Sequence, residues 1–290
     1  MKRKKIFITG GTGFIGKEVV KLLMNSQDYD LTVLTRKNSF ISPNRNLNFI
    51  RGDILDRNSF KSYIEKTDII LHIAGLSTGD ENMIRKTNID GTKNLVDLSR
   101  NKKFIFISSE NVFYKNQGAY GESKKICEQL VKKLNDHLIL RVSVVYGKGD
   151  YTRLGKMISL CKKWRILFIP GNGKSLMQPI FLDDVAFFIL NGIINDKKGA
   201  YVLAGGTKIS INEFVDRIGD TIGRRILKIH IPLFILFPFI KLNEYLLKNP
   251  IVKWTQLKNM NTKRVYDIEG TIKEFRYIPL NIDEGLKRIL

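Results

Sequence analysis

The chain has 290 residues, of which 43% are hydrophobic and 27% are charged, so it is long enough to bury one large α/β core and a smaller lobe. Its two cysteines, Cys127 and Cys161, have neither metal-site spacing nor the density of a disulfide framework, which predicts a reducing cytoplasm and no metal site. The net charge of +21 reflects lysines that are spread along the chain, and no nucleic-acid motif accompanies them. A general lysine bias, or the attraction of anionic small molecules, therefore explains the charge better than a nucleic-acid partner does.

A glycine-rich turn follows the first predicted strand. Residues 5–9 are a short apolar run and residues 17–23 have helical spacing, so the glycines lie between a strand and a helix. Glycines here allow a tight turn, close approach of a pyrophosphate and close packing of helix on strand. Because helix N-termini favour anions, we predict cofactor contacts from this turn, with a purely structural turn as the alternative. The predicted contact residues are Gly10, Gly13, Phe14, Ile15 and Gly16.

The end of the second predicted strand, residues 30–34, bears on which dinucleotide binds. An acidic residue there would favour the ribose of NAD, whereas an arginine suits the 2′-phosphate of NADP. Arg36 therefore favours NADP(H), while NAD(H) or a solvated basic pair with Lys37 remain alternatives. Two more buried strands, at residues 49–53 and 68–75, are expected to bring Asp53, Ile54 and Ala74 to the same site.

Proton chemistry is predicted beside this cofactor. Tyr120 and Lys124 are four residues apart on a helical stretch, so their side chains project from one face. A free tyrosine has a pKa of about 10, and a neighbouring ammonium would lower that pKa towards neutrality. Since the pair lies between a strand ending at Ser109 and a later strand at residues 140–141, we predict that Ser109, Tyr120 and Lys124 are catalytic.

Together these motifs resemble the extended or atypical short-chain dehydrogenases/reductases, the NAD-dependent epimerase/dehydratase family that modifies nucleotide sugars. Further landmarks are the Gly52-Asp53 pair, Asn88, Tyr146-Gly147, the Gly-Asn-Gly at residues 171–173 and Asp183-Asp184. In this family the lysine matching Lys124 also holds the nicotinamide ribose, so Tyr120 and Lys124 are expected to contact the cofactor. The resemblance also implies that Ser109 hydrogen-bonds the substrate oxygen and that Tyr120 donates a proton when a carbonyl is reduced.

The alternation of strands and helices from residue 5 to about residue 145 predicts an α/β fold. We expect a Rossmann-type doubly wound parallel sheet with a smaller C-terminal substrate lobe. The expected division is an NAD(P)-binding domain at residues 1–165 and a mainly substrate-binding lobe at residues 166–290, with the chain weaving between them. A strand at residues 200–203 is expected in the second lobe.

The sequence departs from the family pattern at positions that contact substrate. Val144 stands where related enzymes often have an asparagine, and residues 177–184 lack the Arg-Asp pair that many epimerases have before the late aspartate. The diphosphate clamp is therefore altered or supplied elsewhere. Arg153, Lys156 and Lys174 are candidates, and a solvated basic face explains them equally well. Glu110-Asn111 replaces the Asp-Glu of a dehydratase site, which argues against 4,6-dehydration.

Three functions remain open on these grounds. The favoured one is NADPH-dependent reduction of a 4-keto sugar nucleotide, because Arg36 suits an exchangeable NADPH. The second is a nucleotide-sugar 4-epimerase that retains NAD(P). The third belongs to another class, a non-catalytic NADPH-binding scaffold or membrane-linked assembly protein, against which Ser109, Tyr120 and Lys124 argue.

An apolar stretch at residues 229–240 has its own interpretation. It is shorter than the ~20 residues of a spanning helix and contains Pro238, so it does not resemble a transmembrane segment. We expect a helix of the smaller lobe that packs on the core or forms a homodimer contact. Peripheral contact with the inner face of a membrane is the alternative, because Lys228, Lys241, Lys248 and Lys253 flank the stretch. The first five residues lead directly into a strand and do not resemble a signal peptide.

Overall fold

The computed structural model describes residues 3–36, 46–150, 152–246 and 263–290. The chain divides into two compact units. Unit 1 comprises Met1–Phe113, Gln117–Val142 and Val185–Tyr201, and unit 2 comprises Tyr114–Asn116, Ser143–Asp184 and Val202–Leu290. The expected division at residues 1–165 and 166–290 stays a prediction. Lys37, Lys248 and Lys253 lie outside the described residues.

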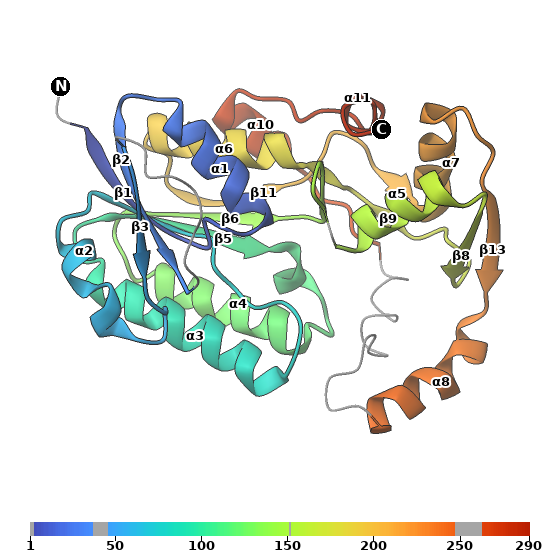
Figure 1. Cartoon of the computed structure of the whole chain (residues 1–290), viewed down its shortest axis with the longest axis horizontal. Coiled ribbons are helices and arrows are strands. Elements are labelled where there is room, and N and C mark those ends of the chain that lie inside the picture. The colour runs from blue at the N-terminus through green and yellow to red at the C-terminus, as the bar shows by residue number, and fades with distance from the viewer. Residues whose placement is uncertain (1–2, 37–45, 151, 247–262) are drawn as a thin grey trace. The chain divides into compact units, whose positions relative to one another are not determined.

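A seven-stranded sheet of order β11-β6-β5-β4-β1-β2-β3 forms the centre of unit 1 (Figure 1). The pairs from β6 through β3 are all parallel, so the predicted Rossmann-type fold is confirmed. The strand expected at residues 200–203 is β11, which lies beside β6, because α6 returns the chain to that edge of the sheet. The strands are β1 (Lys4–Thr9), β2 (Tyr29–Thr35), β3 (Leu47–Arg51), β4 (Ile69–His72), β5 (Lys103–Ser109), β6 (His137–Val142) and β11 (Gly199–Leu203).

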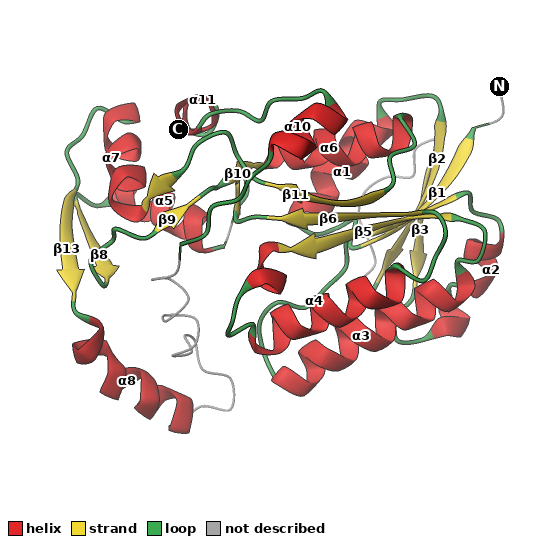
Figure 2. Cartoon of the chain, turned by 180° about the vertical axis from the view of Figure 1, so that it is seen from behind, coloured by secondary structure: helices red, strands yellow, loops and turns green. Residues whose placement is uncertain are grey.

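Helices cover both faces of this sheet. In Figures 1 and 2, α2, α3 and α4 lie on one face, and α1 and α6 lie on the other. Phe7, Phe104 and Phe106 of the central strands are fully buried, as expected for a sheet covered on both sides. The helices are α1 (Phe14–Met24), α2 (Lys61–Glu65), α3 (Glu81–Leu98), α4 (Gly118–Val131) and α6 (Leu182–Ile194), with 3-10 turns η1 (Arg57–Ser59) and η2 (Glu110–Phe113).

Unit 2 is built from short two-stranded sheets and helices. The pairs β10-β7 and β13-β8 are parallel, and β12-β9 is antiparallel. Tyr146, Phe181 and Phe214 pack edge to face in its core. Its strands are β7 (Val145–Tyr146), β8 (Ile166–Pro170), β9 (Leu176–Met177), β10 (Ile180–Phe181), β12 (Ile209–Ser210) and β13 (Leu227–Ile231). Its helices are α5 (Arg153–Lys163), α7 (Ile211–Thr221), α8 (Leu233–Leu246), α10 (Glu269–Phe275) and α11 (Ile282–Lys287).

The apolar stretch at residues 229–240 divides between two elements. Its first three residues end β13, and α8 begins at Leu233 and continues through Pro238. The expected packing of this stretch on the core is wrong, because Phe234 is 76% exposed and Phe239 is 67% exposed. Within the described residues, the helices are all too short or too polar to cross a bilayer.

Candidate cofactor and catalytic site

The glycine turn joins the end of β1 to the start of α1 in unit 1. Gly10 has φ of +74°, and a Cβ on it would lie 2.5 Å from the backbone nitrogen of Ala74. A Cβ on Gly16 would overlap the carbonyl oxygen of Gly10. Both positions therefore require glycine, Gly10 for its backbone conformation and Gly16 for the close approach of the helix to the turn.

The N-terminus of α1 fits an anionic group. Gly13 is the N-cap, and in the part of the chain that the structure describes no side chain caps this helix and no acidic residue occupies its first turn. A Cβ on Gly13 would approach only the oxygen of Gly10, at 3.3 Å, so the backbone is open to a ligand here. Uncapped N–H groups and the helix dipole are what a pyrophosphate requires.

A pocket of about 500 Å³ lies over this turn, wholly within unit 1. Arg36 is exposed directly after β2, and Asp53 follows β3 with its Oδ1 accepting a hydrogen bond from the backbone nitrogen of Leu55 at 2.9 Å. The carboxyl ends of neighbouring parallel strands thus meet at one pocket, as the Rossmann arrangement requires. Nine residues predicted to bind the cofactor line it: Gly10, Gly13, Phe14, Ile15, Gly16, Arg36, Asp53, Ile54 and Ala74.

The predicted catalytic residues lie on β5 and α4 of the same unit. Ser109 ends β5, and its side chain lies near the phenol of Tyr120 on α4, whose pKa it lowers. Lys124, one turn further along α4, is 3% exposed and donates a hydrogen bond from Nζ to the carbonyl oxygen of Ile107 at 2.7 Å. A Cβ on Gly75, which lines the pocket, would lie 3.2 Å from this Nζ. The structure therefore brings Ser109 and Tyr120 together and places Lys124 against the pocket wall.

The protonation of these groups differs from the expectation. Burial raises the pKa of Tyr120; the Ser109 side chain has the next largest effect and lowers this pKa, and the charge of Glu110 raises it. The predicted lowering of this pKa by Lys124 is wrong, because burial dominates and the lysine ammonium is directed at Ile107. Burial lowers the pKa of Lys124 to about 8, against smaller raising effects of Cys127 and Glu128. At neutral pH the phenol therefore holds its proton, and most of the lysine is charged.

Buried polar side chains fix the two helices behind the site. The Asn88 amide on α3 donates to the Ser123 hydroxyl on α4 at 2.9 Å, and its Oδ1 accepts from the backbone nitrogen of Leu76 at 2.7 Å. Asn88 was a landmark of the resemblance, but its role as a link between the pocket wall and α4 could not be deduced from spacing. The link holds α4, and with it Tyr120 and Lys124, at a fixed place beside the sheet.

A second buried group, Glu128, was missed in the sequence. Its carboxylate accepts from the Ser108 hydroxyl at 2.6 Å and from Nη2 of Arg141 at 2.7 Å. These bonds tie α4 to β5 and β6 next to Ser109. The only sequence signal was the i, i+4 spacing of Glu128 from Lys124, which does not reveal partners on other elements.

His72 on β4 is a structural histidine. It is 1% exposed, and its ring nitrogens form hydrogen bonds with the hydroxyls of Thr9 at 2.7 Å and Thr92 at 3.0 Å. Burial, and then the charge of Lys124, lower the pKa of His72 to about 3. The imidazole is therefore neutral at physiological pH and unsuited to be a general base.

The residues at the substrate-contact positions lie in unit 2. Val144 packs against the hydrophobic core. Gln178 is 2% exposed, and its amide donates to the carbonyl oxygen of Gly205 at 2.8 Å and accepts from the backbone nitrogen of Tyr266 at 2.9 Å. Val144 and Gln178 therefore both make contacts within the protein itself. Lys156 and Lys174 are exposed, and the side chain of Arg153 lies outside the described part of the structure.

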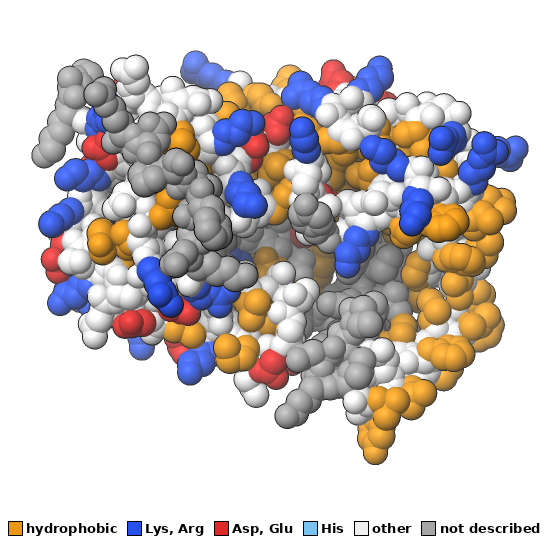
Figure 3. Space-filling model, in the orientation of Figure 1, with side chains coloured by type: hydrophobic (Ala, Val, Ile, Leu, Met, Phe, Trp, Pro, Cys, Tyr) orange, Lys and Arg blue, Asp and Glu red, His pale blue; other side chains and the backbone are white. Residues whose placement is uncertain are grey.

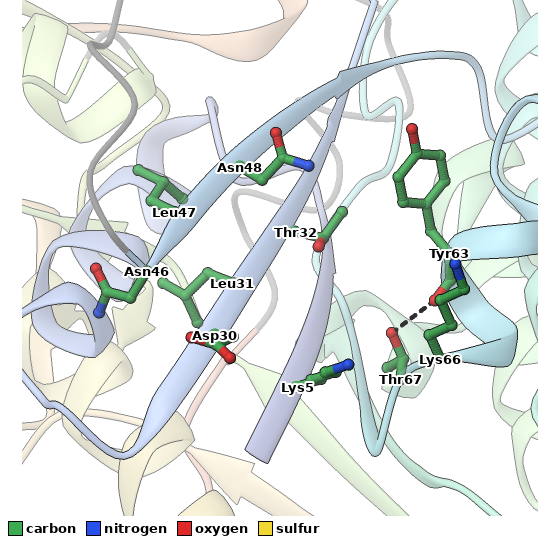
Figure 4. Close-up of a pocket in the computed structure, with 10 residues that line it drawn as sticks. All are labelled: Lys5, Asp30, Leu31, Thr32, Asn46, Leu47, Asn48, Tyr63, Lys66 and Thr67. Atoms are coloured by element: carbon green, nitrogen blue, oxygen red, sulfur yellow. Dashed lines mark hydrogen bonds between the residues drawn. The ribbon is translucent and has the colours of Figure 1, made fainter. Parts of the chain in front are cut away.

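A second pocket, of about 370 Å³, lies at the amino ends of the strands in unit 1. Figure 4 shows Tyr63 and Lys66 from the α2 region across from Thr32 and Asn48 of the neighbouring strands. Ligands of doubly wound sheets bind at the carboxyl ends, so this pocket is not the cofactor site. Among the described residues, no group of three or more His, Cys, Asp or Glu side chains is arranged to hold a metal ion.

The fold and the uncapped helix over a glycine turn define a dinucleotide-binding protein of the extended short-chain dehydrogenase/reductase type. The model of the NAD dependent epimerase/dehydratase family matches residues 6–204. The chain belongs to this family, and it is an NAD(P)-dependent enzyme.

Individual relatives are distant. The chain is 20% identical to the 3beta-hydroxysteroid-dehydrogenase/decarboxylase isoform 2 of Arabidopsis thaliana, in a match that covers 98% of this chain and 61% of that longer protein. It is 28% identical to a putative UDP-glucose 4-epimerase of Methanocaldococcus jannaschii, over 76% of this chain and 83% of the relative. The crystal structure of UDP-glucose 4-epimerase with UDP-glucose from Thermotoga maritima has a TM-score of 0.78 with 21% identity, covering 98% of this chain and 96% of the other. That structural likeness establishes the fold.

Proposed function

We propose that this protein is an NADPH-dependent reductase of a 4-keto sugar linked to a nucleotide. The proposal rests on the place of Tyr120 on α4 beside Ser109 at the end of β5, and on burial, which raises the pKa of the phenol. A tyrosine whose pKa is raised is a proton donor at neutral pH, which is the role that carbonyl reduction requires. Oxidation of an alcohol would instead require a phenolate, which burial disfavours here.

The pocket residues fit NADPH in this proposal. The first turn of α1 would hold the pyrophosphate, Arg36 the 2′-phosphate and Lys124 the nicotinamide ribose. NADPH, when bound, supplies hydride to the carbonyl carbon. Ser109 orients the carbonyl oxygen, and Tyr120 transfers its phenolic proton to that oxygen to complete the hydroxyl.

The substrate class rests on the relatives and on charge. One relative is named a putative UDP-glucose 4-epimerase, and a net charge of +21 attracts polyanions such as nucleotide sugars. Glu110-Asn111 stands where a dehydratase would have Asp-Glu, so the proposal excludes 4,6-dehydration. A 3-hydroxysteroid belongs in the substrate screen, because another relative is named for that class.

A nucleotide-sugar 4-epimerase is the second candidate, and the name of the 28% identical relative favours it. An epimerase oxidises and re-reduces one sugar, so it retains its nicotinamide and consumes none. Purified protein that carries bound NAD(P) and interconverts two nucleotide sugars without net change in NADPH absorbance would favour this candidate. Steady consumption of NADPH with a 4-keto sugar nucleotide favours the reductase.

The proposal is tested by a substrate screen together with an Arg36→Asp variant. Arg36→Asp removes a charge-assisted hydrogen bond and adds repulsion, so NADPH binding should weaken about tenfold or more while NADH binding changes little. Arg100→Asp makes the same charge change at an exposed position just before β5, away from the pocket, and should leave both affinities unchanged. Equal affinities for NADPH and NADH before and after the Arg36 change contradict the NADPH assignment. NADPH binding without turnover on any compound of the screen would indicate the non-catalytic scaffold.

A further inference from the structure

The small parallel sheet of β8 and β13 in unit 2 has one exposed face that is entirely apolar. In β8 the side chains alternate, with Leu167 and Ile169 in the core and Ile166 and Phe168 exposed, the latter by 61%. Leu227 and Ile229 of β13 are also exposed, and the strand register pairs Leu227 with Ile166 and Ile229 with Phe168. Outward positions of a half-exposed sheet are normally polar, so four adjacent apolar side chains indicate a surface that contacts another partner.

Helix α8 extends this apolar surface. It follows β13 directly after Pro232, and its exposed side chains include Phe234, Ile235, Phe237, Phe239, Leu242 and Leu246. Figure 3 shows a band of hydrophobic side chains over β8, β13 and α8, with Lys and Arg side chains above its upper end. The 14 residues of α8 span about 21 Å, less than the ~30 Å of a bilayer core, so the helix is suited to lie along an interface.

Cations gather at the amino ends of the two strands. Five exposed cations lie there. Those before β8 are Lys162, Lys163 and Arg165, and those before β13 are Arg224 and Arg225. The two groups are adjacent, because Nη1 of Arg224 donates to the carbonyl oxygen of Lys162 at 3.3 Å.

An exposed tryptophan lies among these cations. Trp164 is 56% exposed, and the ammonium of Lys163 lies 5.3 Å from its ring centre. Of the acidic neighbours, Asp216 is ion-paired with Lys228, and Asp220 is exposed. Aromatic side chains with cations beside an apolar face are typical of contact with lipid headgroups and the acyl boundary.

We propose that the exposed face of β8 and β13, together with α8, binds the surface of an anionic lipid bilayer. Apolar side chains would enter the headgroup boundary while the five cations contact anionic headgroups. A second copy of the chain is the less favourable occupant, because a symmetric contact would bring two cationic groups together. The proposal is independent of the reaction that the enzyme catalyses.

The test is co-sedimentation of the full chain with vesicles of phosphatidylcholine mixed with phosphatidylglycerol, and with vesicles of phosphatidylcholine alone. We expect binding to the anionic vesicles at low salt that weakens as salt is raised. Phe168→Asp should weaken it about tenfold or more, because the substitution places a charge in the apolar contact. Arg224→Glu with Arg225→Glu should weaken it comparably, and mainly at low salt.

Ile278→Asp is the matched control, because Ile278 is 74% exposed in unit 2 but lies outside the proposed surface. This variant should bind vesicles as the native chain does, and thermal unfolding should confirm that all variants are folded. Absence of binding to anionic vesicles at low salt overturns the proposal, as does equal binding by native protein and Phe168→Asp. A concentration-dependent dimer that Phe168→Asp dissociates, without vesicle binding, would show instead that a second copy covers the surface.

Discussion

Lys124 offers a direct test of the site, because the protein holds its charge at an energetic cost. Its ammonium is buried on α4, donates to the carbonyl oxygen of Ile107 at 2.7 Å and lies 4.5 Å from the ring centre of Phe106. Replacing Lys124 with Met keeps a long unbranched side chain and removes the charge. Lys125→Met is the matched control, since Lys125 is the exposed next residue of the same helix.

The magnitude follows from the pKa. Burial lowers the pKa of Lys124 from 10.5 to about 8, and at 1.36 kcal/mol per unit the folded state loses about 3 kcal/mol by keeping the lysine charged. Between about pH 8 and pH 10.5 the unfolded chain binds more protons at this residue than the folded chain, so its contribution to stability rises with pH. The native free energy of unfolding should therefore gain about 3 kcal/mol relative to Lys124→Met across this range.

The assay is urea unfolding of the native protein, Lys124→Met and Lys125→Met at a series of pH values. Subtracting the curves removes the titration of the other groups from the comparison. Lys124→Met should also lose turnover and weaken nicotinamide binding, whereas Lys125→Met should retain both. A constant difference between native and Lys124→Met from pH 8 to pH 10.5 refutes the lowered pKa, and full activity of Lys124→Met refutes its place in the site.

Two further substitutions test other parts of the site. Tyr120→Phe removes the proton donor but little of the ring packing, so turnover should fall about a hundredfold or more. A titration with NADPH should show unchanged cofactor binding. Full activity of this variant would mean that another group donates the proton. His72→Gln removes an imidazole whose pKa is lowered from 6.5 to about 3. Between these pH values the unfolded chain binds more protons at this residue than the folded chain. The free energy of unfolding of the native protein should therefore fall relative to that of the variant as pH drops through this interval, by up to about 5 kcal/mol. Parallel unfolding curves for native and variant protein below pH 6.5 would contradict the buried neutral histidine.

The parts of the site that depend on short stretches of sequence could be predicted. The glycine turn is local, because the φ of Gly10 and the tight packing at Gly16 are set within seven residues. Arg36 and Asp53 follow the next two strands of the sheet, β2 and β3, so their place at the same pocket follows from the parallel order. The one-turn spacing of Tyr120 and Lys124 likewise follows from the helix alone.

Properties that depend on distant segments could not be predicted. The direction of the Tyr120 pKa shift is set by burial among several elements, which a spacing of four residues does not reveal. The apolar stretch at residues 229–240 has the same composition whether it is buried or exposed, and only the structure shows that Phe234 and Phe239 face outward. The position of β11 beside β6 could not be predicted, because the chain returns to the first sheet after leaving it.

The distribution of these residues between the units bears on what can vary in this enzyme. Every residue predicted for cofactor and proton chemistry lies in unit 1, and the buried side chains of His72, Asn88 and Glu128 support it from within that unit. The departures from the family pattern at Val144 and Gln178 lie in unit 2, where both side chains have structural contacts. Under the proposed function, the groups that transfer the proton therefore belong to unit 1, whereas Val144 and Gln178 belong to unit 2.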